Sequence, residues 1–142
     1  MALGLSGPAW CAVTTNECLG QLAAKVAAVE GLQAVYGYRT AKAELATQAA
    51  ITSIAQMPAD SPVGLALAYD YIIDVLVRID GDYAAAEQAL NDIVDGIWPA
   101  IWGANEPYWS NCYPYAYSQK PPSPQELNGY RRALLYVRVI PN

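Results

Sequence analysis

The chain has 142 residues, of which 54% are hydrophobic and 15% charged, and its net charge is −5. This length and balance predict one folded domain with a sizeable core and exclude an intrinsically disordered chain. The acidic balance argues against a duplex-binding surface, which needs clustered Lys and Arg, although a protein that encloses DNA without gripping it stays compatible.

Residues 1–13 are expected to form an arm, because two glycines and Pro8 interrupt regular structure there. A single domain then covers residues 14–142. Trp10 is a large apolar side chain in this arm, and it either folds back onto its own domain or reaches a neighbouring subunit. The N-terminus lacks the basic and long apolar regions of a signal peptide, and no window is apolar enough for a membrane span.

The first helix is expected over residues 15–30. Thr14 and Glu17 have the spacing of a capping box, and Gly31 is a natural residue after the helix end. Apolar residues follow the cap at helical spacing, namely Leu19, Leu22, Val26 and Val29. This narrow apolar stripe predicts that the helix packs on the face of a sheet.

Strands are expected next. Residues 32–39 alternate and contain β-formers, which predicts a strand. Residues 40–48 are ambiguous between helix and strand, and period-two apolar residues predict a strand over 49–57. Two prolines then predict a loop over residues 57–62.

Residues 69–79 form the clearest strand pattern. One face is apolar, and the other is mixed, as in a strand that is buried on one side and partly wet on the other. The apolar face consists of Tyr69, Tyr71, Ile73, Val75, Val77 and Ile79, and the mixed face of Asp70, Ile72, Asp74, Leu76 and Arg78. Asp80 and Asp82 follow, and they favour helix capping over metal binding.

An amphipathic helix is expected from Tyr83 to about Ile97, with Pro99 kinking or ending it. A strand is expected within residues 108–118, and Pro114 confines it to a sheet edge. Residues 120–128 are expected to be a loop. The last strand covers residues 130–140, with Ala133, Leu135, Val137 and Val139 on one face and Arg132, Leu134, Tyr136 and Arg138 on the other.

This order predicts an α+β fold: a mostly antiparallel sheet of four to five strands with the two main helices packed on one face. Hairpin-like spacing between the strands favours the antiparallel arrangement.

Histidine is absent from the sequence. Its absence excludes Ser-His-Asp and Cys-His nucleophile activation and removes most zinc and iron sites. Asp70 and Asp74 share a strand face at about 13 Å, which exceeds the separation of glycosidase carboxylates. No GxGxxG, P-loop, CxxC or GxSxG motif occurs. We therefore expect no enzyme, no catalytic residues, no bound metal and no cofactor.

The three cysteines are Cys11, Cys18 and Cys112. An odd number without CxxC spacing predicts reduced thiols in a cytoplasmic context. A Cys11–Cys18 bridge is an alternative, and it would need strand-like or loop geometry at one end.

The aromatic segment 98–117 is the most distinctive surface candidate. Lys120 is the only basic residue between Gly81 and Pro124, which argues against stacking on single-stranded nucleic acid. Tyr and Trp also pack in cores and anchor protein interfaces, and both interpretations stay open. The interface candidates are Trp10, Trp98, Trp102, Tyr108, Trp109, Tyr113, Tyr115 and Tyr117.

The element order resembles the tail terminator and tail-completion (neck) proteins of long-tailed bacteriophages. The resemblance covers residues 14–140 and rests on a length, an element order and an acidic turn followed by an Ala-Glu-x-x-Leu-x-Asp-Ile helix. The segments that carry it are Val35–Arg39, Tyr71–Ile79, Asp82–Val94 and Leu134–Val139.

The resemblance implies a structural virion protein that acts in the virion tail or neck and is assembled in the host cytoplasm. It implies a homo-oligomeric ring, usually a hexamer, that caps the tail tube and joins it to the head. The implied partners are further copies of the chain, the tail tube and head-completion proteins, with DNA passing through the channel as cargo and no membrane. Two alternatives are a monomeric ligand-binding module that uses the segment 98–117 and, least supported, a histidine-free enzyme that uses carboxylates.

Overall fold

The computed structural model of the chain describes residues 13–38, 45–61, 64–120 and 129–142, with only the backbone described for 57–61, 64–66 and 120. The expected arm with Trp10 and Cys11, and the expected loop over 121–128, therefore lie outside the described residues.

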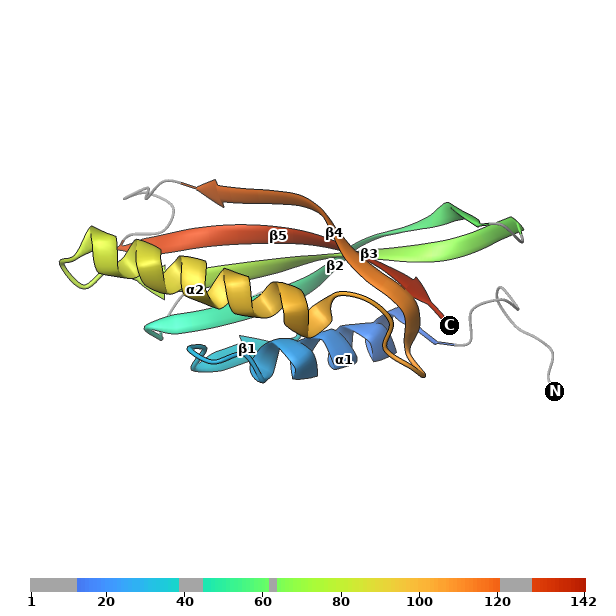
Figure 1. Cartoon of the computed structure of the whole chain (residues 1–142), viewed down its shortest axis with the longest axis horizontal. Coiled ribbons are helices and arrows are strands. Elements are labelled where there is room, and N and C mark those ends of the chain that lie inside the picture. Colours follow the sequence, from blue (N-terminus) through green and yellow to red (C-terminus); the bar gives the residue numbers. More distant parts are fainter. Residues whose placement is uncertain (1–12, 39–44, 62–63, 121–128) are drawn as a thin grey trace.

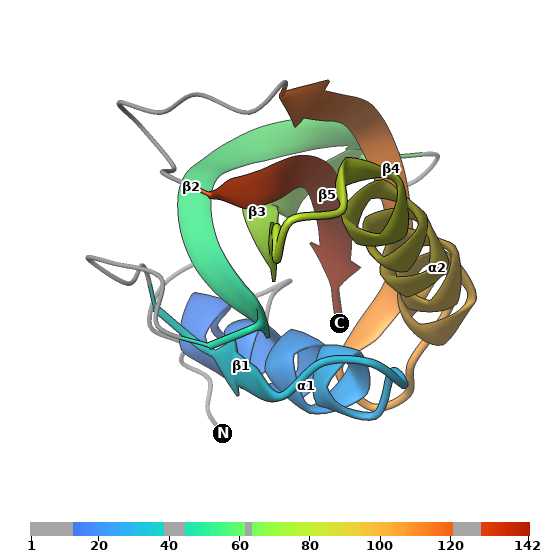
Figure 2. The same ribbon diagram turned by 90° about the vertical axis from the view of Figure 1, so that its left-hand side faces the viewer.

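A five-stranded sheet in the order β1-β2-β3-β5-β4 forms one layer, and two helices form the other (Figure 1). β1 runs parallel to β2, and the remaining neighbours are antiparallel. Both helices contribute to a single core with the same face of the sheet. The α+β prediction is thus confirmed. Seen end-on, the sheet is strongly twisted, and β2 sweeps around β3 and β5 (Figure 2).

Helix α1 (Thr15–Ala27) begins at the expected capping box. The Thr14 backbone N–H donates to Glu17 Oε1 at 2.9 Å, and the Glu17 N–H donates to Thr14 Oγ1 at 3.2 Å. The helix ends three residues earlier than expected, at the C-cap Ala28, so Gly31 does not follow its end directly. Gly31 instead adopts a φ of 102° in the turn that leads to β1 (Ala34–Tyr36), where a Cβ would lie 3.2 Å from Ile93.

Strands β2 (Thr47–Ser61) and β3 (Gly64–Arg78) form one long antiparallel hairpin. The expected strand over 49–57 is confirmed, and the ambiguous segment is strand from Thr47 onward. The loop expected over 57–62 is wrong, because residues 57–61 stay paired in β2. Pro58 is tolerated there because β1 pairs only with residues 48–50, which leaves this part of β2 as an edge.

Helix α2 (Tyr83–Ile101) begins at the N-cap Asp82, whose side chain accepts a hydrogen bond from the Ala85 N–H at 3.1 Å. The helix end expected near Ile97 is wrong, because Pro99 lies inside the helix. Its missing N–H removes one bond in the last turn, and the turn still closes where the Trp102 N–H donates to the Trp98 carbonyl at 3.0 Å.

The core lies between the helices and the inner face of the sheet. The odd-numbered residues from 69 to 77 of β3 and from 133 to 141 of β5 (Tyr130–Pro141) are buried there, as the alternation predicts. β4 (Trp109–Lys120) is an edge strand, as Pro114 predicts. α2 lies close to the segment that follows α1, since a Cβ on Gly96 would lie 2.9 Å from the Val29 side chain.

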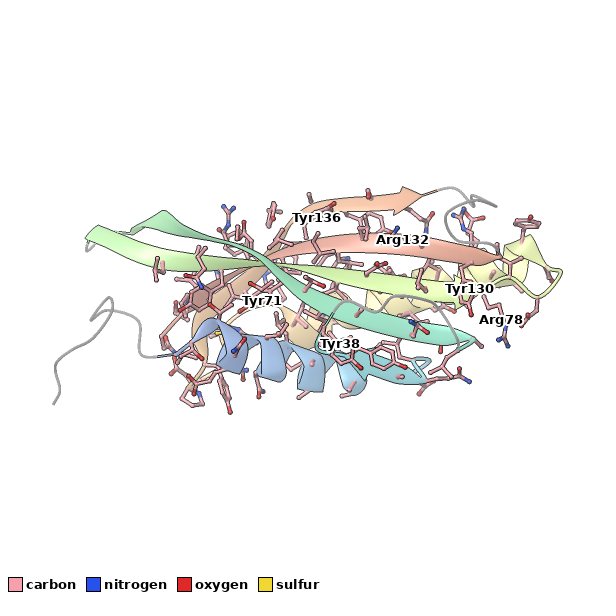
Figure 3. All side chains as sticks on the ribbon, turned by 180° about the vertical axis from the view of Figure 1, so that it is seen from behind. Tyr38, Tyr71, Arg78, Tyr130, Arg132 and Tyr136 are labelled. Carbon is pink, nitrogen blue, oxygen red and sulfur yellow. The ribbon has the colours of Figure 1, made fainter. Side chains whose placement is uncertain are left out.

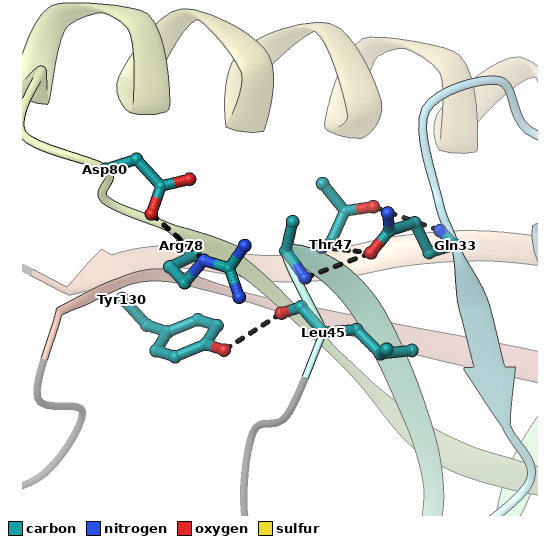
Figure 4. A network of polar contacts seen from close by, with 7 residues as sticks. Gln33, Leu45, Thr47, Arg78, Asp80 and Tyr130 are labelled. Carbon is teal, nitrogen blue, oxygen red and sulfur yellow. Dashed lines mark hydrogen bonds and ion pairs between the residues drawn. The ribbon is translucent and has the colours of Figure 1, made fainter.

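Polar contacts hold the chain together at one end of the sheet (Figure 4). Gln33 Oε1 accepts hydrogen bonds from the Ala46 and Thr47 backbone at 3.0 and 3.4 Å. The Tyr130 hydroxyl donates to the Leu45 carbonyl at 2.9 Å, which ties β5 to the segment before β2.

Candidate assembly surface

The sheet has a second face, here called the outer face, which points away from both helices. The strand alternation assigns to it the even-numbered residues of β3 and β5, together with neighbours on β2 and β4. These residues are Gln48, Ala50, Thr52, Asp70, Ile72, Asp74, Leu76, Tyr113, Tyr115, Arg132, Leu134, Tyr136 and Arg138. Neither of the two described helices covers this face, yet several of its residues are buried, including Gln48, Asp70, Leu76 and Leu134.

An aspartate–arginine pair lies on the outer face, near one end of the β3–β5 pairing. Asp70 and Arg138 stand directly opposite each other on β3 and β5. The guanidinium donates through Nε and Nη2 to the two carboxylate oxygens, each at 2.8 Å. The Asp70 side chain is only 3% exposed and that of Arg138 26%. The hydrogen bond to Asp70 raises the pKa of Arg138 above its usual range, so the arginine stays charged.

A second pair, Asp74 with Arg132, lies further along the same two strands. Arg132 donates through Nε and Nη2 to the carboxylate of Asp74, at 3.0 and 2.7 Å. In the sheet register Arg132 stands opposite Leu76, so it reaches its partner diagonally. Figure 3 shows Arg132 and Tyr136 along β5. The two aspartates and two arginines cancel, so the outer face carries no net charge.

Aromatic rings extend this surface toward β4. The register shifts between Pro114 and Ala116, and Tyr115 is the extra residue of the bulge. Its ring lies 6.0 Å from that of Tyr136, and the Arg138 guanidinium carbon is 4.8 Å from its centroid. Partial burial, followed by the neighbouring Asp70, raises the pKa of the Tyr115 hydroxyl.

The structure separates the aromatic candidates into three groups. Trp109 is fully buried, and its indole N–H donates to the Gly103 carbonyl at 2.9 Å, so we remove it from the interface candidates. Trp98 and Tyr108 are partly buried against the core. Trp102, Tyr115 and Tyr117 are exposed and Tyr113 is half-buried, while Trp10 lies outside the described residues. The segment 98–117 is therefore not one continuous surface.

Helix α2, in contrast to the outer face, carries an excess of negative charge. Its exposed side chains include Glu87, Asp92 and Asp95, and it contains no basic residue. Glu87 has a cation within 4 Å, Arg131 of β5 at 3.6 Å. Burial and the nearby Asp95 raise the pKa of Tyr117, which stands on β4 beside this helix. The negative charge of the chain is therefore concentrated on the helix side.

Buried thiols and a tyrosine occupy the core beneath α1. Tyr71 is fully buried, and its hydroxyl donates to the Thr15 carbonyl at 2.8 Å (Figure 3). Burial, followed by the neighbouring Cys18, raises the pKa of Tyr71. Burial also raises the pKa of the Cys112 thiol to about 12, so this thiol is unreactive at neutral pH.

In the described ranges, no three His, Cys, Asp or Glu side chains are grouped so that they could hold a metal ion. Asp80, a potential ligand, instead pairs with Arg78 at 3.0 Å. Within the same ranges, no helix is both long and apolar enough to cross a membrane.

The pairing of the acidic residues is the feature that sequence reasoning missed. Both aspartates and both arginines had been placed on mixed strand faces, but their partners depend on the β3–β5 register. The signal in the sequence that could have predicted the pairing is that β3 carries aspartates and β5 carries arginines on their mixed faces.

No protein-family model matches the sequence, and no curated protein matches it. Among solved structures, the chain is similar to a chain of one described as the virion of a native gene transfer agent particle. The two are 21% identical with a TM-score of 0.45, and the likeness covers 84% of this chain and 83% of that chain. This likeness is too distant to support an argument about function.

Proposed function

We propose that the chain is a non-enzymatic structural subunit of a phage-like virion, which assembles with copies of itself into a tail terminator or neck ring. The observation that carries the proposal is the outer face. It combines half-buried aromatic and aliphatic side chains with two aspartate–arginine pairs, and neither α1 nor α2 covers it. Such a composition is typical of a surface that another subunit covers.

The element order supports the same proposal. The helix, the long strand, the acidic turn with its second helix and the closing strand occur in the order on which the resemblance to tail terminator and neck proteins rests. The proposal does not depend on the gene transfer agent likeness, although that particle is an assembly of the same general kind.

The uneven charge distribution suggests how a ring would be oriented. Charges on α2 are exclusively acidic, so this helix would repel the same helix of a neighbour. In a ring that passes DNA as cargo, a negatively charged channel wall would prevent the DNA from adhering. We therefore expect α2 to face the channel or solvent, and the outer face to lie in subunit contacts.

The proposal includes a ring of six subunits. It also includes contacts with the tail tube and with head-completion proteins, and a location in the virion. The ligand-binding alternative has no specific observation in its favour, because the aromatic side chains of 98–117 are divided between core and separate surfaces.

Size-exclusion chromatography with light scattering tests the proposal. It should be run at several protein concentrations, with and without a tail-tube protein. We expect a closed oligomer, or one that forms on the tube, and ring-shaped particles in negative-stain images. A chain that stays monomeric at every concentration and never joins the tube would refute it.

A further inference from the structure

The β2–β3 hairpin is longer than the sheet to which it belongs. β5 pairs with β3 only from Tyr69 to Arg78. Beyond that point residues 57–61 and 64–68 pair with each other, from Met57 opposite Ala68 to Ser61 opposite Gly64, and with no other strand that the structure describes. Leu67 and Ala68, at the base of this segment, still pack on the core. This segment, here called the ribbon, projects from the body of the domain past both helices (Figure 1).

The ribbon starts at an irregularity that redirects it. The register of β2 and β3 shifts between Ser53 and Ala55, so Ile54 is the extra residue of a bulge. Just beyond it, the Gln56 side-chain amide donates a hydrogen bond to the Thr15 hydroxyl at the start of α1. This hydrogen bond ties β2 to α1 close to the point where the hairpin leaves the body.

Two properties indicate that the ribbon does not stand alone in the working protein. A two-stranded hairpin is marginally stable in water without a third strand or a covering layer. The sequence of the ribbon, Met-Pro-Ala-Asp-Ser followed across the turn by Gly-Leu-Ala-Leu-Ala, contains Asp60 as its only charged residue. A projection with one charged residue in its sequence, whose edges pair with no other described strand, is suited to contact a partner surface.

The outer face has the properties that such a partner needs. Its charges are paired within the chain, so covering it isolates no ion. It also offers half-buried Ile72, Tyr136 and Thr52 at its centre, between the two ion pairs. The exposed side of α2 is a poor partner, because Asp92 and Asp95 would repel the ribbon's carboxylate.

The dimensions of the two surfaces also agree. Beyond Leu67 and Ala68, which pack on the chain's own core, three residues of each strand project, and they span about 10 Å. The strands that carry the two ion pairs, β3 and β5, are neighbours about 5 Å apart. One ribbon is therefore long enough to lie across both of these strands on a neighbouring sheet.

We propose that the ribbon of one subunit lies across the outer face of a second copy, over the Asp70–Arg138 and Asp74–Arg132 pairs. The inference rests on the proposed self-assembly and specifies the contact. Because the ribbon and the outer face are different surfaces, the contact is head-to-tail. Repeating a head-to-tail contact closes a ring when the rotation allows it.

Two variants test this contact from its two sides. In the short-ribbon variant, residues 59–66 are replaced by Asn-Gly, a turn that suits a two-residue hairpin. This variant retains Leu67 and Ala68, which pack against the core or lie in it. In the face variant, Ile72→Lys places a charge at the centre of the outer face, and Thr52→Lys is a second version in case the first does not fold. Gln88→Lys adds the same charge on an exposed position of α2 and is the matched control.

Light scattering then measures the mass of each variant and of mixtures. We expect the wild type and Gln88→Lys to assemble, and the short-ribbon and face variants to be monomers with wild-type circular dichroism. An equal mixture of the two monomeric variants retains one intact ribbon and one intact face. It should therefore form a species of two chains and nothing larger.

The outcomes separate the contact from the proposed function. If a folded short-ribbon or face variant assembles like the wild type, or if the mixture stays monomeric, the ribbon contact is refuted while self-assembly stands. If the wild type itself never assembles, both are refuted.

Discussion

Replacing Arg138 with leucine removes the cation from a carboxylate that is almost completely buried. Asp70 is 3% exposed and accepts two hydrogen bonds from Arg138. A buried ion left without its partner typically costs about 3–5 kcal/mol of stability. Since the Arg138 side chain is 26% exposed, water partly replaces it, and we expect a loss near the lower limit, about 3 kcal/mol.

The chain provides two graded controls for this value. Arg132 and Asp74 are 22% and 23% exposed, so Arg132→Leu should cost about 1–2 kcal/mol. Arg78 and Asp80 are 43% and 70% exposed, so Arg78→Leu should cost less than about 1 kcal/mol. The expected order of destabilisation therefore follows the burial of the three carboxylates.

Urea unfolding followed by circular dichroism measures these differences. The measurements should be made at two protein concentrations, because assembly makes apparent stability depend on concentration. The double variant Asp70→Leu/Arg138→Leu should lose less stability than Arg138→Leu alone, because no buried charge is left unpaired. Equal losses for the three arginine variants, or a double variant that is worse than the single one, would refute the reasoning.

Three further predictions concern packing, capping and the thiols. Gly96→Ala should lower the free energy of unfolding, because its Cβ would lie 2.9 Å from Val29 and overpacking costs about 1–3 kcal/mol, more than the helix gains from alanine. Gly20→Ala, with open space around the new Cβ, should instead stabilise the protein by about 0.5–1 kcal/mol. Similar thermal shifts for the two glycine variants would contradict the close approach of Gly96 to Val29. Thr14→Ala should cost about 1 kcal/mol in urea unfolding, since it removes the cap of α1, and no change would mean that the cap contributes nothing. Cys112→Ser should not change the rate of thiol labelling of the folded protein at pH 8, but it should remove one reactive thiol in urea. Because burial raises the pKa of Cys112 from 9.0 to about 12, the unfolded chain loses a proton above pH 9 that the folded chain keeps, and stability should fall as pH rises between these values. Rapid labelling of Cys112 in the folded protein would contradict the burial of this thiol.

Local patterns account for much of the fold. The Thr14–Glu17 capping box, the Asp82 cap and the alternation of β3 and β5 were all predicted and are confirmed. Each of these features depends on residues that are close in the chain, so their spacing is sufficient to predict them.

The errors have a common physical origin in long-range pairing. Residues 57–61 contain a proline and small residues typical of a loop, yet pairing with β3 holds them in a strand. The helix was expected to run to about Ile97, with Pro99 kinking or ending it, but α2 continues to Ile101 because packing against the sheet favours one more turn, in which Ile101 is buried. In both segments, tertiary contacts outweigh local propensity.

By itself, the sequence determined the class of the fold, the positions of its main helices and strands, and the absence of histidine-based chemistry. These properties follow from composition and from periods of two and 3.6 residues, which need no knowledge of distant partners. Only the tertiary structure decided which aspartate meets which arginine, that Trp109 belongs to the core, and that the β2–β3 hairpin extends beyond its sheet. The ion pairs depend on the register between β3 and β5, and strands that pair across more than fifty residues are not specified by the local pattern of either one. The burial of Trp109 and the length of the hairpin depend likewise on how β4 pairs with β5 and β2 with β3.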